Sequence, residues 1–464
     1  MKNNKIKALV IAMAVCMFTA GCSAGLDNTQ TADGNNAAAA QGTETAVKVT
    51  QDNAQESEQE ESAVSEESSG IRAQSDESSE ISSDSEASEK AESSEDSEDS
   101  TFTKRDLEQE ADTEDAQYIT VSDGAVIDIT EAGTYVLSGS AKNCTVRVET
   151  DKESKVQLVL DGLEIVNDDF PAIYVVSADK VFITTAGGST NTLEVTGSFT
   201  ADGDTNTDAV IFSKDDLVLN GLGTLEIVSS YGNGISCKDD LKATGGSYVI
   251  TSALDSIEAN DSISISDGSF VINSSKDGLH CENDDDDTLG IITITGGSFE
   301  INAAADGIQG TYLTEIDGGS YNITAGEGIE CTYVLINDGE IYITASDDGI
   351  NASNKSKSQE VAIEINGSYL NIVMGQGDTD AIDANGNIYV NGGTIDITST
   401  VSSFDYDGTA EYNGGTIIIN GSQVDSIPQS MMGGPGGGFG GDMGGFGGDM
   451  GGFGGRMGGR GGWQ

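Results

Sequence analysis

The chain has 464 residues, of which 79 are Asp or Glu and 21 are Lys or Arg, giving a formal net charge of -58 at pH 7. This charge excludes a nucleic-acid-binding protein, because phosphates would be repelled as they approach. Residues 148–455 contain no Arg, and the whole chain contains only three Pro. The scarcity of Pro is compatible with a long β-sheet ladder, which Pro would interrupt.

The first 22 residues have the pattern of an export signal. Three Lys precede an apolar run at 8–18, which is too short to span a bilayer. The run ends in Ala-Gly-Cys22, which resembles the lipobox of bacterial lipoproteins, whose Cys is lipidated and becomes the mature N-terminus. We therefore expect 1–22 to be removed up to a lipid-anchored Cys22 at the extracellular face of the cell membrane. An ordinary secretion signal with a chance Cys is the alternative.

Low-complexity segments follow the signal and end the chain. Residues 23–117 are rich in Ser and Glu, and such a segment cannot bury enough apolar surface to offset its ordering entropy. We expect a disordered tether there. The Gly-rich stretch 429–464 repeats Gly-Gly-Phe-Gly-Gly-Asp-Met at 437–443 and 444–450, and we expect a flexible tail.

Two short pieces repeat between 118 and 428. One is Gly-Gly-Ser-aromatic-x-Ile, found at 245–250, 296–301 and 318–323, with a near copy at 267–272. The other is an acid, a small residue and an aliphatic residue. Successive acids are 22, 29, 21, 21 and 32 residues apart, and removing two visible insertions restores a period near 22.

A period near 22 with short alternating strands predicts a solenoid of parallel strands. Each repeat buries its apolar face only by stacking on its neighbours. We therefore predict an all-β parallel β-helix of roughly 13 or 14 coils over residues 118–428.

Equivalent positions of successive coils should stack in columns. The aromatic residues Tyr248, Phe270, Phe299 and Tyr321 form one column, for which core packing is favoured over a sugar-stacking strip. Cys237, Cys281 and Cys331 fall at a small inward position. Neighbouring thiols there are two coils apart, so we expect buried free thiols, with Cys144 also free.

A column of acidic residues carries the main functional prediction. Like charges stacked about 5 Å apart are destabilising unless they are neutralised, and clustered oxygen ligands outside the cell favour Ca²⁺. The candidate metal ligands are Asp255, Asp277, Asp306, Glu327, Asp348 and Asp380. The candidate ligand-binding residues, three positions further on, are Glu258, His280, Gln309, Glu330, Asn351 and Asp383. The alternative is that each Asp caps a turn by accepting backbone N–H groups.

The ordered motifs resemble a known family. They include Phe102 to Leu107, Thr134 to Gly139, Val156 to Gly162, Ala178 to Thr184 and Ile211 to Leu217, followed by the repeats. Over about 102–425 the chain resembles the bacterial carbohydrate-binding domain-containing lipoproteins. The resemblance implies a right-handed parallel β-helix similar to pectate lyases, with calcium sites and binding of acidic polysaccharides such as polygalacturonate without cleavage.

The expected function is therefore a lipid-anchored, monomeric, calcium-dependent carbohydrate-binding protein without enzymatic activity. A polysaccharide lyase is one alternative, for which the Arg-free region offers no guanidinium base. Lys238, Lys242 and Lys276 could replace it, but nothing in the sequence places them beside the acids. A hydrolase needs two carboxylates, which pairs such as Asp239-Asp240 and Asp347-Asp348 could supply. A structural adhesin is the third alternative.

Overall fold

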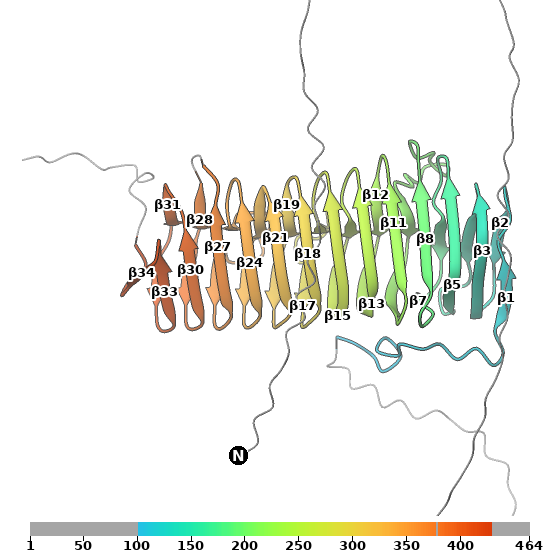
Figure 1. Cartoon of the computed structure of the whole chain (residues 1–464), viewed down its shortest axis with the longest axis horizontal. Coiled ribbons are helices and arrows are strands. Elements are labelled where there is room, and N and C mark those ends of the chain that lie inside the picture. The colour runs from blue at the N-terminus through green and yellow to red at the C-terminus, as the bar shows by residue number, and fades with distance from the viewer. Residues whose placement is uncertain (1–100, 377–378, 429–464) are drawn as a thin grey trace, which may run out of the picture. The chain divides into compact units, whose positions relative to one another are not determined.

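The chain forms a parallel solenoid in which most coils contribute three short strands, and in four coils one long strand replaces two of them (Figure 1). The structure is a computed structural model that describes residues 101–376 and 379–428. The predictions for the signal with Cys22, for the tether up to residue 100 and for the tail 429–464 lie outside the described residues.

One face of the solenoid is a 12-stranded sheet whose strands pair in parallel. Its strands are β2 (Val126–Ile129), β4 (Thr145–Glu149), β6 (Ile173–Ser177), β9 (Ala209–Ser213), β12 (Asn233–Cys237), β14 (Ile257–Ala259), β16 (Leu279–Cys281), β19 (Asp306–Gly310), β22 (Glu327–Cys331), β25 (Ile350–Ala352), β28 (Asp380–Ala384) and β31 (Ser402–Tyr406).

The other sheet has 22 strands in two parallel ladders, which long strands join around a corner. The first ladder contains β1 (Gln117–Thr120), β3 (Gly133–Lys142), β5 (Lys155–Asn167), β7 (Lys180–Thr185), β10 (Asp216–Gly221), β13 (Asp240–Ser252), β15 (Ser262–Ser274), β17 (Ile291–Ile294), β20 (Leu313–Ile316), β23 (Tyr333–Ile336), β26 (Ala362–Ile365), β29 (Asn387–Val390) and β32 (Ala410–Tyr412). The second ladder uses the far halves of β3, β5, β13 and β15 together with β8 (Thr190–Val195), β11 (Thr224–Ser229), β18 (Ser298–Ala303), β21 (Ser320–Ala325), β24 (Glu340–Ala345), β27 (Tyr369–Met374), β30 (Thr394–Thr398), β33 (Thr416–Ile419) and the antiparallel β34 (Ser422–Val424).

This architecture confirms the predicted all-β parallel β-helix. The 12-stranded sheet has fewer strands than the 13 or 14 coils expected, because several coils are longer than the period of 22, above all the coil between β6 and β9. Ile173 and Ile211 are register partners although they are 38 residues apart. The segment between β8 and β9 accounts for much of this extra length.

The inward columns are as predicted. The rings of Tyr248, Phe270, Phe299 and Tyr321 stack with centroids 5.0, 4.9 and 4.8 Å apart, and all four are buried. Among the described cysteines, Cys144, Cys237, Cys281 and Cys331 are free and buried. Stacked rings and small residues therefore fill the interior that the repeats predict.

The start of the domain differs from the prediction. Residues 101–116 were assigned to the tether, but they lie against the solenoid (Figure 1). Asp106 is fully buried, and its carboxylate lies 3.7 Å from the Nζ atoms of Lys180 and Lys242. The side chain of Gln109 donates to the Thr244 carbonyl at 2.8 Å. These contacts join residues more than 70 positions apart, so the composition of the segment does not predict them.

None of the residues that the structure describes forms a helix with the length and hydropathy needed to cross a lipid bilayer.

Candidate functional site

The 12-stranded sheet aligns both predicted columns of polar residues. Asp306 is the register partner of Glu327, and the aliphatic residues two positions after the other acids pair in the same way. The second column is paired directly as Glu258 with His280, His280 with Gln309, Gln309 with Glu330, Glu330 with Asn351, and Asn351 with Asp383. The alignment agrees with the predicted columns, whereas the roles of these residues remain predictions.

Several acids of the first column also cap the next coil. Oδ1 of Asp255 accepts the N–H of Asp277 at 3.0 Å, and Oδ1 of Asp277 accepts the N–H of Asp306 at 3.0 Å. Asp348 accepts the N–H of Asp380 in the same way. The turn-capping interpretation therefore holds for these oxygen atoms.

Four of the six acids, Asp277, Asp306, Glu327 and Asp348, are followed by a glycine, and the reason is steric. A Cβ atom at Gly307 would lie 2.6 Å from the Gly328 carbonyl oxygen of the next coil, and one at Gly328 would lie 2.3 Å from that of Gly349. The backbones approach too closely there for a side chain, so the acidic groups sit on tightly packed main chain.

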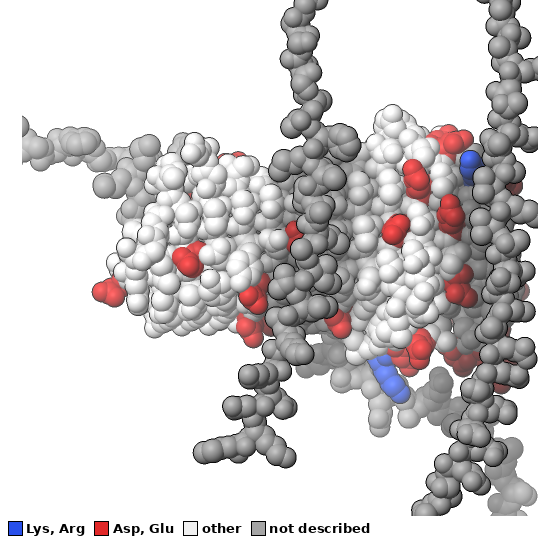
Figure 2. Space-filling model, in the orientation of Figure 1, with Lys and Arg blue, Asp and Glu red and all other residues white. Residues whose placement is uncertain are grey.

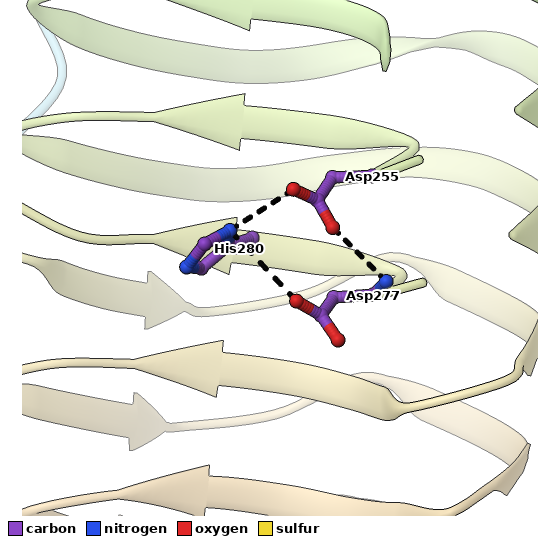
Figure 3. Close-up of side chains that lie close together, drawn as sticks. All are labelled: Asp255, Asp277 and His280. Atoms are coloured by element: carbon purple, nitrogen blue, oxygen red, sulfur yellow. Dashed lines mark hydrogen bonds and ion pairs between the residues drawn. The ribbon is translucent and has the colours of Figure 1, made fainter. Parts of the chain in front are cut away.

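At the N-terminal end of the column, Asp255, Asp277 and His280 form a cluster (Figure 3). Lys276 joins this cluster through ion pairs with both carboxylates. His280 Nδ1 lies 3.1 Å from Asp255 Oδ2, and Lys276 Nζ lies 2.8 Å from the same oxygen and 3.4 Å from Asp277 Oδ2. Burial opposes ionisation of Asp255, but the bonds from His280 and Lys276 outweigh it and lower its pKa to about 2. An internal ammonium thus already neutralises this part of the column.

His280 is 7% exposed and has partners on both ring nitrogens. Nε2 lies 3.3 Å from Glu282 Oε2 and 3.2 Å from Gln309 Nε2. Burial lowers the pKa of His280, but the bond to Asp255 dominates and raises it above the usual value. When it is protonated, the ring adds a second positive charge to this end of the column.

Further along, Asp306, Glu327 and Glu330 form a cluster of carboxyl groups. One oxygen atom from each lies within 4.8 Å of the others. Burial and the neighbouring carboxylates Asp277, Glu327 and Glu330 raise the pKa of Asp306 to about 8, and burial with Glu330 raises that of Glu327 to about 7. Lys355 supplies one ammonium, 2.7 Å from Glu330 Oε2. The Asp306 carboxylate does not cap the next coil, since the Glu327 N–H donates to the Ala305 carbonyl instead.

The last acids of the two columns also have raised pKa values and few cationic neighbours. Burial followed by nearby acids raises the pKa of Asp348 to about 6 and that of Asp383 to about 7. In the described ranges, no Lys or Arg forms an ion pair with either carboxylate. Raised carboxyl pKa values therefore recur along the column at Asp306, Glu327, Asp348 and Asp383.

Residues of the two predicted columns contact each other. A residue of the second column contacts the acid of the preceding coil, as His280 contacts Asp255. Similarly, Asn351 Nδ2 donates to Glu327 Oε2 at 3.1 Å. A ligand of the acidic column would therefore also meet the second column.

The structure assigns partners to lysines that the sequence left unplaced. Lys276 lies beside the acids and Lys238 lies 3.3 Å from Glu258, whereas Lys242 pairs with Asp106 in another part of the fold. The signal for Lys276 was present, because the residue before the acid is uncharged or acidic in the other coils. Lys355 is in an insertion whose folding the repeat does not predict.

A third group of carboxylates lies outside the predicted columns. Asp216, Asp239 and Asp240 each place one oxygen within 4.8 Å of the others. Burial and neighbouring acids raise the pKa of Asp239 to about 6, while Asp216 pairs with Lys180 at 3.5 Å. Asp240 accepts a hydrogen bond from Ser262 at 2.6 Å.

The raised pKa values predict how stability depends on pH. Asp306, Glu327 and Asp383 bind protons more tightly when folded than when unfolded, so in metal-free buffer the free energy of unfolding should fall as pH rises from about 5 to 8. Each group contributes at most about 1.4 kcal/mol per pH unit. The raised pKa of His280 acts in the same direction, whereas the lowered pKa of Asp255 matters only in stronger acid. Urea unfolding at several pH values checks this, and a rise in stability toward pH 8 would contradict it.

Comparisons with known proteins agree with the region of the repeats. The family model described as carbohydrate-binding domain-containing protein matches residues 123–378 and 329–426. A protein of Acetivibrio thermocellus with the same description is 36% identical over 126 residues, which are 27% of this chain and 44% of that protein. The chain thus matches less than half the length of this relative. A solved structure of a polysaccharide lyase-like protein from C. thermocellum, a gadolinium derivative, has a TM-score of 0.45 and 29% identity, covering 47% of this chain and 96% of the other.

Proposed function

The chain belongs to the family of carbohydrate-binding domain-containing proteins, and from this premise we propose that it binds an acidic polysaccharide through Ca²⁺. We further propose that it does so as a monomer, held at the outer face of the cell membrane by a lipid on Cys22. The anchor rests on the sequence pattern of residues 1–22.

The cluster of Asp306, Glu327 and Glu330 carries the calcium proposal. Its donors are all carboxylate oxygens, which Ca²⁺ prefers, and they converge within 4.8 Å. The raised pKa values of Asp306 and Glu327 mean that their negative charges are poorly compensated. A dication would relieve this repulsion, so the residues fit the ion.

Calcium would also reduce the electrostatic repulsion between this acidic protein and an acidic polysaccharide. A chain with a net charge of -58 repels an acidic polymer unless cations lie between them. Bound Ca²⁺ would supply positive charge toward uronate carboxylates. In this proposal Gln309, Glu330 and Asn351 of the second column, which are aligned by the strand register, contact sugar hydroxyl groups next to the ion.

We propose binding without cleavage, because the lysines near the column are engaged as ammonium ions. Lys276 pairs with Asp255, Lys355 with Glu330, and the ion pairs raise the pKa of both lysines against the effect of burial. A lysine held protonated is a poor base for the proton abstraction that a lyase requires.

The test is binding of polygalacturonate by isothermal titration calorimetry. Binding is expected with about 1 mM Ca²⁺, within the range that extracellular calcium modules require, and its loss with EDTA. Neutral dextran serves as the polymer control. Equal affinity with and without EDTA would contradict the proposal, and ultraviolet absorbance from an unsaturated product would show a lyase instead.

A further inference from the structure

Two tyrosines lie side by side on the outer face of the second ladder, away from the acidic columns of the 12-stranded sheet. Tyr342 of β24 and Tyr369 of β27 are 39% and 38% exposed. Their ring centroids are 5.7 Å apart, and the ring planes are inclined by 58°. In the aromatic column of the core the rings are buried, so this exposed pair is not part of the interior packing.

The pair is held by its neighbours in the sheet. The hydroxyl of Tyr342 donates to Glu340 at 2.6 Å, and Glu340 is the register partner of Tyr369. Tyr342 is in turn the register partner of Asn371. Fixed rings lose little conformational freedom when a ligand covers them, which favours binding.

A shallow groove of about 540 Å³ begins at Tyr342 and crosses the neighbouring strands. Its polar lining residues are Ser269, Ser298, Glu300, Ser320, Asn322, Thr344 and Asn371. Hydroxyl, amide and carboxylate groups thus lie beside an aromatic surface. Sugars combine hydroxyl groups with an apolar ring face, and this combination matches the groove and the tyrosines.

The charge of the groove selects among sugars. The residues that line it include a Glu but neither Lys nor Arg. Figure 2 shows the same face over β24, β27 and β30 with scattered carboxylates and no Lys or Arg in view. The Asn322 amide donates to both oxygens of Glu300, at 3.0 and 2.9 Å, which leaves this carboxylate negative. Uronates would be repelled here, whereas neutral hydroxyl groups can donate to the carboxylates.

We infer that this face is a second carbohydrate site, specific for neutral polysaccharides. A pyranose ring stacks on Tyr342 and Tyr369, and the hydroxyl groups of the adjoining sugars bind Glu300, Asn322 and Asn371. The inference depends on membership of the carbohydrate-binding family but not on calcium. The protein then holds two classes of glycan on two different faces of the solenoid.

Calorimetry in EDTA with neutral β-1,4-linked hexasaccharides of glucose, mannose and xylose tests this site. At least one should bind, and the double variant Tyr342→Ala with Tyr369→Ala should bind it roughly tenfold more weakly or worse. Replacing both residues by Phe should keep the affinity within about twofold, because stacking needs the ring and not the hydroxyl. Tyr118→Ala is the matched control, since Tyr118 is 71% exposed on β1 and lies outside the groove.

The outcomes separate this inference from the proposed calcium site. The variant Asp306→Asn with Glu327→Gln should keep its affinity for the neutral hexasaccharide. Failure of all three hexasaccharides to bind, or unchanged affinity in the double Ala variant, would overturn the second site without affecting polygalacturonate binding. The second site would also be overturned if the neutral hexasaccharide bound with calcium but not in EDTA. Tight binding of oligogalacturonate in EDTA that disappears in the double Ala variant would overturn it as well.

Discussion

Calcium is expected to raise the melting temperature of the metal-free protein by several degrees, and EDTA should reverse the rise. An extracellular site with a dissociation constant of about 0.1 mM contributes roughly 1.4 kcal/mol at 1 mM Ca²⁺. Additional sites among Asp348, Asp380 and Asp383 would add to this. Magnesium should do less, because it requires a tighter octahedron and gives up water reluctantly. Differential scanning calorimetry measures all of these shifts.

The variant Asp306→Asn with Glu327→Gln should lose most of the calcium response and be at least as stable as the wild type without metal. Removing two poorly compensated charges relieves repulsion, and both amides keep an oxygen acceptor. A carboxylate that mainly capped a turn would give the opposite sign, with a loss of stability whether or not calcium is present. The structure supports this distinction, since Asp306 does not accept the N–H of Glu327.

The matched control is Asp161→Asn with Glu164→Gln. Both residues are exposed on β5, and the change in net charge is the same. This variant should respond to calcium like the wild type. An equal loss of response in both variants would mean that calcium acts through net charge and not through the cluster.

The columns could be predicted from sequence because the solenoid repeats. Once the period is known, residues one period apart must stack in a column. The residue types found in a column then indicate whether its side chains point into the core or toward solvent. Tyr248 and Phe270 share their face with Ile, so they are inward, and Cys281 alternates with Ala and Gly in a small inward position. Regular stacking turns a local pattern into a three-dimensional prediction.

The remaining features depend on contacts that the period does not contain. Residues 101–116 resemble the tether in composition, although the family resemblance starts at Phe102. The burial of Asp106 between two distant lysines shows how they pack against the fold. Lys355 reaches Glu330 from an insertion. The pairing of Lys276 determines which acids are already neutralised, and therefore where along one uniform column a cation would bind.

Lys276→Met should produce a second calcium response at a position where the wild type has none. The substitution removes the ammonium beside Asp255 and Asp277 and leaves His280 as the remaining basic side chain in contact with Asp255, so the pKa of Asp255 should rise from about 2. Breaking the pair should cost about 1–2 kcal/mol in metal-free buffer at pH 7, less than for a fully buried pair because Lys276 is partly exposed.

The pH dependence and a control identify the cause of this loss. The stability difference between wild type and Lys276→Met should shrink below about pH 4, where Asp255 becomes protonated in the variant. Calcium should restore more stability to the variant than it adds to the wild type, because two oxygen ligands have lost their ammonium. Lys357→Met removes an equal charge from an exposed position. It should change neither the stability in metal-free buffer nor the stabilisation by calcium. If calcium stabilises Lys276→Met no more than the wild type, Lys276 does not occupy the place of a cation, and the acidic column is not a row of equivalent sites that differ only in their counter-ion.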